Sequence, residues 1–322
     1  TWTKSSSSLN LTYTDRTKAE GKTMRLGCIG IGSNAIRLLV AGWKNGRLID
    51  TRRERRGTRL FAGLVGGKLT EESMQSSVEA VGELAGCARA DGAQKIFIFA
   101  TSAVRDAANG RIFTERCEAI CGTKVEIVSG EEEAVLSYIG ASEGGACGMI
   151  DIGGGSTEFT LGEDERILGA VSLQMGAVRM NAQRPILKYE DYAATVEQCR
   201  RMIQRDAQGL LAFETKPEWV GVGGTMTTLG AMERAIPLFD AQTCEGMTMD
   251  LPTVAGWGRR LARMSMAERR QVPGLMAHRA DIIPSGVAIL EAAMREFGVN
   301  ELRLSAHGNM DGYLKKKFQE KA

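Results

Sequence analysis

The chain of 322 residues is long enough for one large domain or two ordinary ones. Its hydrophobic fraction of 43% and charged fraction of 25% are ordinary for a globular protein, and a formal net charge of only +2 argues against a strongly basic nucleic-acid-binding protein. No apolar run approaches the roughly 18 residues of a membrane span, so no membrane association is expected.

The seven cysteines are scattered and form no CxxC pair, and the chain has only two histidines. This spacing does not suit a zinc site and is typical of unpaired thiols in a reducing cytoplasm, where we expect the protein to be found. Residues 1–23 are polar, include four consecutive serines and lack the apolar core of a signal peptide. We interpret 1–23 as a disordered tail or a remnant of expression or upstream sequence, with the fold beginning near Met24.

From Met24 onward, short strand-like runs alternate with longer helical ones. The strand-like runs are apolar or alternating, are bounded by glycine, asparagine or charge, and lie at 25–31, 36–43, 47–56, 95–100, 124–128, 147–152, 156–161, 166–173, 218–223 and 302–306. The helical runs lie at 71–91, 103–120, 131–142, 189–213, 225–235, 251–263, 279–297 and 308–319. This mixture predicts an α/β protein whose sheets are covered by helices.

One supersecondary unit occurs twice. Residues 28–34 read CIGIGSN and residues 149–156 read MIDIGGGS, and in both places an apolar strand leads through a glycine-rich turn into a second apolar strand. The spacing of about 120 residues predicts two related domains with a cleft between them.

Glycine-rich turns are the first candidates for ligand binding, because glycine lets backbone N–H groups approach an anion closely. Two turns belong to the repeated unit, and a third precedes the helical run at 225–235 without the spacing of a dinucleotide fingerprint or a P-loop. Ordinary chain reversal is the alternative for each turn taken alone. The candidate phosphate-binding residues are Gly32, Ser33, Asn34, Gly153, Gly154, Gly155, Ser156, Gly223, Gly224 and Thr225.

Acidic residues lie beside these turns. Glu131, Glu132 and Glu133 open a helical run, where first-turn acids are ordinarily solvated. Asp151 interrupts an apolar strand and Glu158 follows on the returning strand. Two hard oxygen donors so placed suit Mg²⁺.

Arg105 follows the strand at 95–100, at the start of a helix, where it opposes the helix dipole. A bound anion would explain an arginine at this position, and a surface salt bridge with Asp106 is the alternative.

Taken in order, these pieces resemble the exopolyphosphatase/guanosine pentaphosphate phosphohydrolase (Ppx/GppA) family, in its short two-domain form. The matching stretches span nearly everything after Met24: IGSNAIRLLVA (31–41), ATSAVRDAANG (100–110), SGEEEA (129–134), DIGGGSTEF (151–159), MGAVRM (175–180), GVGGTMTTL (221–229) and ADIIPSGVAIL (280–290).

The resemblance implies two actin-like (ribonuclease H-like) ATPase-type domains with the active site between them. Domain I would be 24–132 plus the C-terminal helix at about 306–322, and domain II would be 133–305. It implies hydrolysis of terminal phosphoanhydride bonds in inorganic polyphosphate or pppGpp, with guanosine penta- or tetraphosphate as ligands, and it allows a homodimer.

The resemblance also implies residue roles. Glu133 would be the base that activates water, and Asp151 and Glu158 would hold Mg²⁺ (or Mn²⁺). Arg105 and the amides of the two repeated turns would bind phosphate oxygens.

Two positions depart from the family pattern. Gly30 replaces an aspartate, and Met310 replaces an arginine. By analogy with Asp151, a side chain at position 30 is expected to point into the cleft toward the metal, so the glycine is expected to weaken activity. A catalytically weakened alarmone sensor and a sugar or acyl kinase of the same superfamily remain the alternative functions.

A basic stretch is a candidate path for polyphosphate, with a solvated β-ribbon edge as its alternative. It comprises Arg52, Arg53, Arg55, Arg56 and Arg59.

Overall fold

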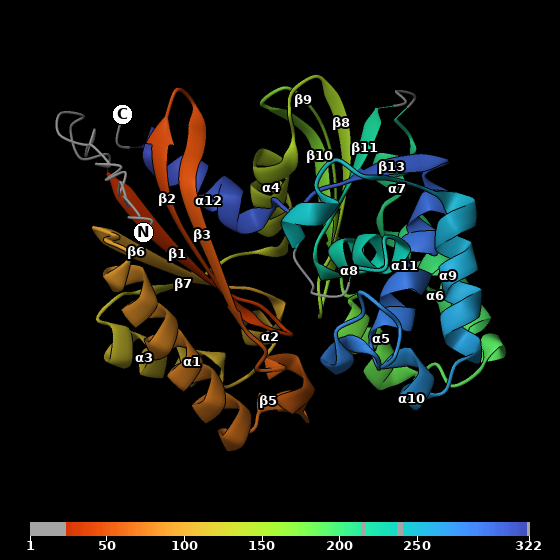
Figure 1. The fold of residues 1–322 in the computed structure, drawn as a ribbon, viewed down its shortest axis with the longest axis horizontal. Coiled ribbons are helices and arrows are strands. Elements are labelled where there is room, and N and C mark those ends of the chain that lie inside the picture. The colour runs from red at the N-terminus through yellow and green to blue at the C-terminus, as the bar shows by residue number, and fades with distance from the viewer. Residues whose placement is uncertain (1–23, 214–216, 237–240, 321–322) are drawn as a thin grey trace, which may run out of the picture.

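The structure is a computed structural model that describes residues 24–213, 217–236 and 241–320, so the predicted tail lies outside the described residues. Two lobes lie side by side, each built on one sheet with helices packed against it (Figure 1). No helix within these described ranges is long and apolar enough to cross a membrane.

The first sheet has the order β3-β2-β1-β6-β7, and β1 runs antiparallel to β2 and parallel to β6. Its strands are β1 (Arg25–Ile31), β2 (Ile36–Lys44), β3 (Arg47–Arg56), β6 (Lys95–Ala100) and β7 (Val125–Ile127). Alternate residues of β1 enter two different cores: Ile29 and Ile31 pack with α1 (Glu71–Ala90) and α3 (Gly110–Cys121), and Leu26 and Cys28 pack with α12 (Asn309–Gln319).

The second sheet has the order β10-β9-β8-β11-β13-β12. Its strands are β8 (Ala146–Ile152), β9 (Thr157–Glu163), β10 (Arg166–Leu173), β11 (Glu218–Val222), β12 (Thr248–Asp250) and β13 (Glu301–Leu304). The meander β8-β9-β10, with β11 parallel to β8, matches β1-β2-β3 with β6, so the predicted internal repeat is present in the structure.

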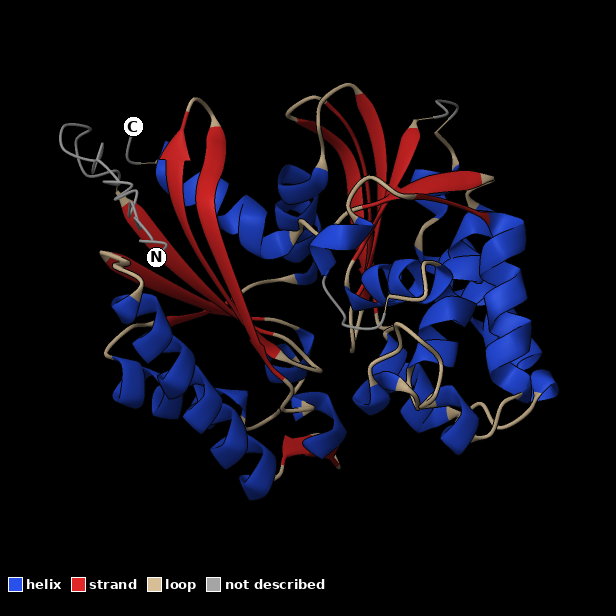
Figure 2. Ribbon diagram, in the orientation of Figure 1, coloured by secondary structure: helices blue, strands red, loops and turns tan. Residues whose placement is uncertain are grey.

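Helices cover the second sheet and also lie between the sheets of the two lobes (Figure 2). The largest core surrounds α11, which is buried along most of its length. The remaining elements are α2 (Ser102–Arg105), α4 (Gly130–Ala141), α5 (Ala177–Gln183), α6 (Tyr189–Asp206), α7 (Gln208–Leu211), α8 (Gly224–Glu233), α9 (Leu251–Arg263), α10 (Met266–Arg269), α11 (Ile283–Glu296), β4 (Leu64–Val65), β5 (Lys68–Leu69), and 3₁₀ turns at Leu60–Gly63, Ala241–Cys244 and Ala277–Arg279.

The predicted elements are largely present, with differences at their ends. The run 103–120 is two helices, because the Asn109 side chain exchanges hydrogen bonds of 2.8 and 2.9 Å with the backbone of Leu69 and draws the chain away from a helical path. The run 279–297 becomes helical only at Ile283, where Pro284 occupies the first turn. The short elements β4, β5, β12, α5 and α10 were not predicted.

The predicted domain boundary at 132/133 falls inside α4. This helix begins at Gly130 because Ser129 and Glu132 form a capping box that satisfies its first backbone amides. Helix α4 packs against α12 between the two sheets (Figure 1). Helix α12 covers the face of the first sheet that carries Leu26 and Cys28.

Candidate active site

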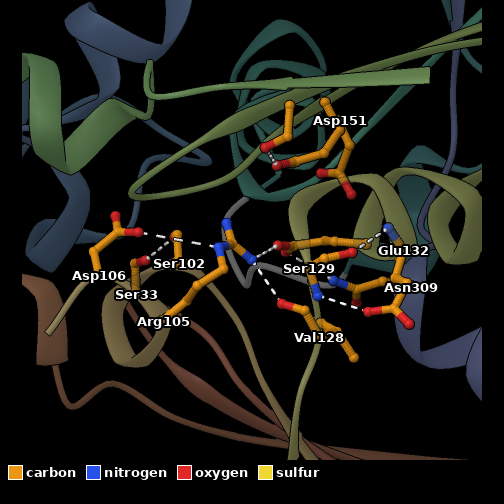
Figure 3. Close-up of polar contacts among 12 residues, drawn as sticks. Ser33, Ser102, Arg105, Asp106, Val128, Ser129, Glu132, Asp151 and Asn309 are labelled. Atoms are coloured by element: carbon orange, nitrogen blue, oxygen red, sulfur yellow. Dashed lines mark hydrogen bonds and ion pairs between the residues drawn. The ribbon is translucent and has the colours of Figure 1, made fainter. Parts of the chain in front are cut away.

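The two repeated turns, one from each lobe, lie against each other. A Cβ atom built on Gly154 would lie 2.8 Å from Ser33 Cβ, and one on Gly155 would lie 2.4 Å from Ser102 Oγ. The two serine hydroxyls are themselves 2.9 Å apart (Figure 3). Glycine is therefore required here by the close approach of the lobes, in addition to any contact with a ligand.

A cavity of about 100 Å³ lies between these turns, and we call it the catalytic cavity. Ten of the predicted site residues line it: Gly32, Ser33, Asn34, Glu133, Asp151, Gly153, Gly154, Ser156, Gly223 and Gly224. The amide of Asn34 is buried, and among the described residues neither its Nδ2 nor its Oδ1 has a partner. An unpartnered amide that lines a cavity is suited to contact a ligand.

Glu133 is the one acid of the SGEEEA stretch that faces the cavity. Glu131 and Glu132 are exposed, and Glu132 accepts a hydrogen bond from the amide of Ser129 (Figure 3). Glu133 is only 7% exposed. Burial, and then the charge of Asp151, raise the pKa of Glu133 to about 7.

Both carboxylate oxygens of Glu133 have a partner. Arg105 Nη1 lies 3.5 Å from Oε2, and Asn309 Nδ2 donates to Oε1 at 3.4 Å. The side-chain oxygen of Asn309, Oδ1, in turn accepts a hydrogen bond from Arg37 Nη2 at 3.1 Å. Arg37 and Asn309 both line the cavity, and neither was singled out from the sequence.

Arg105 does not line the cavity. It donates to the Val128 carbonyl at 2.9 Å and lies 4.0 Å from Asp106 (Figure 3), and it contacts Glu133 from outside the cavity. Its Nη2 is buried without a partner among the described residues. A direct phosphate contact by Arg105 stays a prediction, whereas its contact with Glu133 is observed.

Asp151 and Glu158 are direct partners across the β8–β9 ladder. Asp151 lines the cavity and accepts a hydrogen bond of 2.5 Å from Ser137. Glu158 lies behind it, accepts from Ser172 at 2.7 Å and does not line the cavity. Burial raises the pKa of both carboxyl groups, and that of Glu158 is raised further by Glu133 and Asp151.

These two carboxylates would hold a magnesium ion only together with oxygens of water and of the substrate phosphates. Among the described residues, no three Asp, Glu, His or Cys side chains converge as a metal cage. Mg²⁺ usually takes one or two carboxylates, waters and substrate phosphates, and Asp151 is placed to supply one of these ligands. A role for Glu158 as a direct ligand stays a prediction.

Gly155 and Thr225 are the other predicted residues that do not line the cavity. Thr225 is buried and packs against Gly286 of α11, where a Cβ atom would lie 2.4 Å from its hydroxyl. This contact packs α8 against α11, and a phosphate contact by Thr225 stays a prediction.

Three arginines that were not grouped together from the sequence face the catalytic cavity. Arg37, Arg55 and Arg279 all line it. Arg279 is 8% exposed and its side chain makes no hydrogen bond or ion pair within the described ranges. Burial, then the charges of Arg55 and Arg37, lower the pKa of Arg279 to about 9. A buried guanidinium with like charges around it is suited to receive an anion.

A larger chamber of about 500 Å³ adjoins the catalytic cavity, and we call it the side chamber. The two share the lining residues Arg37, Arg55, Asp151, Gly223, Gly224, Arg279 and Asn309.

The basic stretch of β3 divides by strand alternation. Arg53 and Arg55 line the side chamber, whereas Arg52 and Arg56 form ion pairs at the edge with Asp91 and Glu83. The edge interpretation therefore describes Arg52 and Arg56, and a path for polyphosphate along Arg53 and Arg55 stays a prediction.

The prediction that position 30 points toward a metal is wrong in this structure. A Cβ atom on Gly30 would lie 3.2 Å from Met310 Cγ and 3.3 Å from Phe99 Cζ, in the core under α12. Gly30 lines neither cavity, and Met310 lines the side chamber. Position 30 corresponds to Asp151 in the repeated unit, but its side-chain direction leads into the core under α12, which covers this face of β1.

The architecture is that of two actin-like ATPase-type domains with the cavity at their interface, as the resemblance implied. The chain belongs to the Ppx/GppA phosphatase family, whose profile matches residues 39–321. A solved Ppx/GppA enzyme of Aquifex aeolicus superposes with a TM-score of 0.77 at 26% identity, covering 92% of this chain and 100% of that one.

Two relatives at the sequence level carry different activities in their names. Exopolyphosphatase 2 of Mycobacterium tuberculosis is 31% identical over 310 residues, which cover 89% of this chain and 97% of the relative. Guanosine-5'-triphosphate,3'-diphosphate pyrophosphatase of Photobacterium profundum is 28% identical over 299 residues, which cover 88% of this chain and 57% of the relative.

Proposed function

We propose that this protein releases orthophosphate from the end of inorganic polyphosphate or pppGpp by attack of water on the terminal phosphoanhydride bond. The observation that carries the proposal is that Glu133 and Arg279 face one cavity. The first is a buried carboxylate whose pKa is raised to about 7, and the second is a buried guanidinium without an anionic partner among the described residues. Such a site offers a base for water and a cation for phosphate.

Glu133 would accept the proton of the attacking water. A base with a pKa near neutrality is effective because it is deprotonated at working pH and still basic enough to accept a proton. Asn309 and Arg105 would hold its two oxygens, so that the carboxylate keeps one orientation while water is positioned.

The terminal phosphate would lie between the two turns, with Asn34 and the turn amides as donors. Arg37 and Arg279 would neutralise oxygens that gain charge in the transition state. A bound Mg²⁺ supplies charge neutralisation and orientation of the phosphates. Asp151 would be its ligand in the cavity, and Glu158 would support Asp151 from behind.

Support for the two substrates comes from the names of the relatives, which include both an exopolyphosphatase and a pppGpp-hydrolysing enzyme. The sensor alternative depended on Gly30, and position 30 does not line the cavity. The seven cysteines are unpaired, and all but Cys87 are buried, which supports a reducing compartment such as the cytoplasm.

The test is phosphate release from long-chain polyphosphate and from pppGpp, each with Mg²⁺ and with EDTA. We expect release from at least one substrate and loss of release in EDTA. Phosphate release that is unchanged in EDTA would show that hydrolysis does not need a metal ion. Tight pppGpp binding without release from either substrate would favour a sensor.

A pair of variants tests whether Arg279 binds the substrate. Arg279→Gln should raise KM by roughly 10-fold or more, the value of a lost hydrogen bond to a charged group. Arg270→Gln is the matched control, because Arg270 is exposed and lines neither cavity. Equal KM values for the two variants would exclude Arg279 from substrate binding.

A further inference from the structure

The side chamber holds a histidine whose ring is fixed by a buried carboxylate. His307 Nδ1 lies 2.8 Å from Asp311 Oδ1 and 3.2 Å from Arg53 Nη2. Asp311 is 2% exposed and also accepts from the amide of Gly308 at 3.1 Å, so α12 holds the carboxylate in place. Because both contacts use Nδ1, the imidazole is oriented through one nitrogen only.

The other ring nitrogen is left available. In the described part of the chain, Nε2 of His307 makes no hydrogen bond, the side chain is 38% exposed, and the residue lines the side chamber. An imidazole held at Nδ1 by a carboxylate and open at Nε2 presents a hydrogen-bond donor to a ligand when the ring is protonated, because the neutral ring keeps its single proton on Nδ1.

The lining of the side chamber favours an anionic ligand, although three acids belong to it. Asp311 pairs with Arg53, Glu54 pairs with Arg52 and Arg56, and Asp151 accepts from Ser137. Arg37, Arg55 and Arg279 have no carboxylate partner within the described ranges, since Arg37 donates to Asn309 and Arg55 contacts His278 and Met276. The chamber shares these arginines with the catalytic cavity, so a polyanion with its end in the catalytic cavity would continue into the chamber.

We propose that His307 is a specificity-determining residue that contacts a phosphate group of the substrate beyond the one that is cleaved, through Nε2–H in the side chamber. This rests on the proposed function for the placement of the terminal phosphate. The contact requires the protonated ring, because a neutral ring that donates from Nδ1 to Asp311 carries no proton on Nε2, whereas the imidazolium binds a phosphate through a charged donor.

Three charged groups face the ring within the described ranges. Arg53 comes from β3, Asp311 from α12, and Glu245 from the loop before β12, where it accepts from Ser305 at 3.1 Å. The hydrogen bond to Asp311 raises the pKa of His307, against burial and Arg53, which lower it. Although burial raises the pKa of Asp311, the His307 hydrogen bond and the charge of Arg53 bring it to about 2, so its carboxylate stays ionised wherever His307 titrates.

The experiment measures binding of tripolyphosphate by calorimetry in a Glu133→Gln background, which limits hydrolysis and removes the titration of Glu133. Binding is compared at about pH 6 and about pH 8.5, on either side of histidine titration. We expect His307→Gln to lose roughly tenfold in affinity at the lower pH and little at the higher pH, in line with one charge-assisted hydrogen bond. Because the ligand titrates identically with both proteins, the difference between them reports the ring.

Two further variants and one further ligand sharpen the result. His307→Lys should bind tightly at both pH values, since its charge persists. His278→Gln tests the other histidine of the chain, which lines neither cavity and contacts the chamber-lining Arg55 at 3.0 Å; this variant should retain the pH dependence. Orthophosphate, which fills the catalytic cavity alone, should bind His307→Gln as it binds the background protein.

Two outcomes would overturn the proposal: the same pH dependence with and without His307, or an equal loss of orthophosphate and tripolyphosphate affinity. The proposed function is tested separately by phosphate release from the unsubstituted protein. Absence of release together with the expected binding pattern would reject hydrolysis and retain the role of His307.

Discussion

Met310 of α12 covers Gly30 of β1: a Cβ atom at position 30 would lie 3.2 Å from Met310 Cγ and 3.3 Å from its sulfur. These are the two positions at which the chain departs from the pattern of the family it resembles. They are 280 positions apart in the sequence and in contact in the fold, in a core that also contains Phe99 and Tyr313. The two departures therefore form one local change in packing.

The first prediction concerns this contact. Gly30→Asp should lower the free energy of unfolding by roughly 1–3 kcal/mol, because it crowds Met310 and places a carboxylate in an apolar core. It should leave the Mg²⁺ concentration for half-maximal phosphate release unchanged or higher. Urea unfolding and a Mg²⁺ titration check the two parts.

Gly30→Asp combined with Met310→Arg should recover part of the lost stability, because the arginine supplies a partner for the new carboxylate. A lower Mg²⁺ requirement in Gly30→Asp, with no loss of stability, would show that position 30 does serve the metal.

The second prediction separates the acids of α4. Glu133→Gln should lower turnover by roughly 10²–10⁴-fold, the usual contribution of a positioned base, while substrate still binds. Glu131→Gln is the matched control, because Glu131 is exposed on the same helical turn and should change turnover little. Initial rates of phosphate release distinguish the two, and similar losses in both variants would remove Glu133 from the role of base.

The third prediction is a pH dependence of stability without metal or substrate. The pKa of Glu133 is raised from 4.5 to about 7 and that of Glu158 is also raised, so the folded protein holds protons that the unfolded chain has released. Unfolding free energy should therefore fall as pH rises from about 5 to about 8, by as much as about 3 kcal/mol for Glu133 alone.

Glu158→Gln should flatten this dependence, since its amide is neutral throughout, and added Mg²⁺ should flatten it by stabilising the ionised carboxylates. Denaturant midpoints across the pH range provide the measurement. An unfolding free energy that rises with pH over the same range would contradict the raised pKa of Glu133 and Glu158.

The fourth prediction concerns Arg179 of α5, which joins the lobes. It donates to the Gly155 carbonyl at 2.6 Å, forms an ion pair with Asp106, and stacks 4.6 Å from the ring centre of Phe61. Asp106 adjoins Arg105, which contacts Glu133, so loss of Arg179 should displace both the glycine turn and the base.

Arg179→Met should lower turnover by roughly 10- to 100-fold, as small displacements in an active site do. Arg184→Met serves as the control, because Arg184 is exposed at the end of the same helix. Unchanged turnover in Arg179→Met, measured with the protein fully folded by circular dichroism, would exclude this role.

The sequence by itself determined the features that depend on neighbouring residues. Apolar periodicity located nearly all strands and helices, because a strand or helix buries one face at a fixed repeat. The two glycine turns were found for the same reason, since a tight turn is recognisable over a few residues. Among the three first-turn acids, only the resemblance to the family distinguished Glu133. The ordered motifs then indicated the family.

Only the tertiary structure decided which side chains share the cavity. Arg37, Arg279 and Asn309 are up to 272 positions apart and meet because β2, the segment before α11, and α12 converge between the lobes. The same packing turned Arg105 toward Glu133 and placed Met310 over Gly30. Strand alternation fixes the face on which a residue lies, but the element that covers this face is set by long-range packing, which a local pattern does not encode.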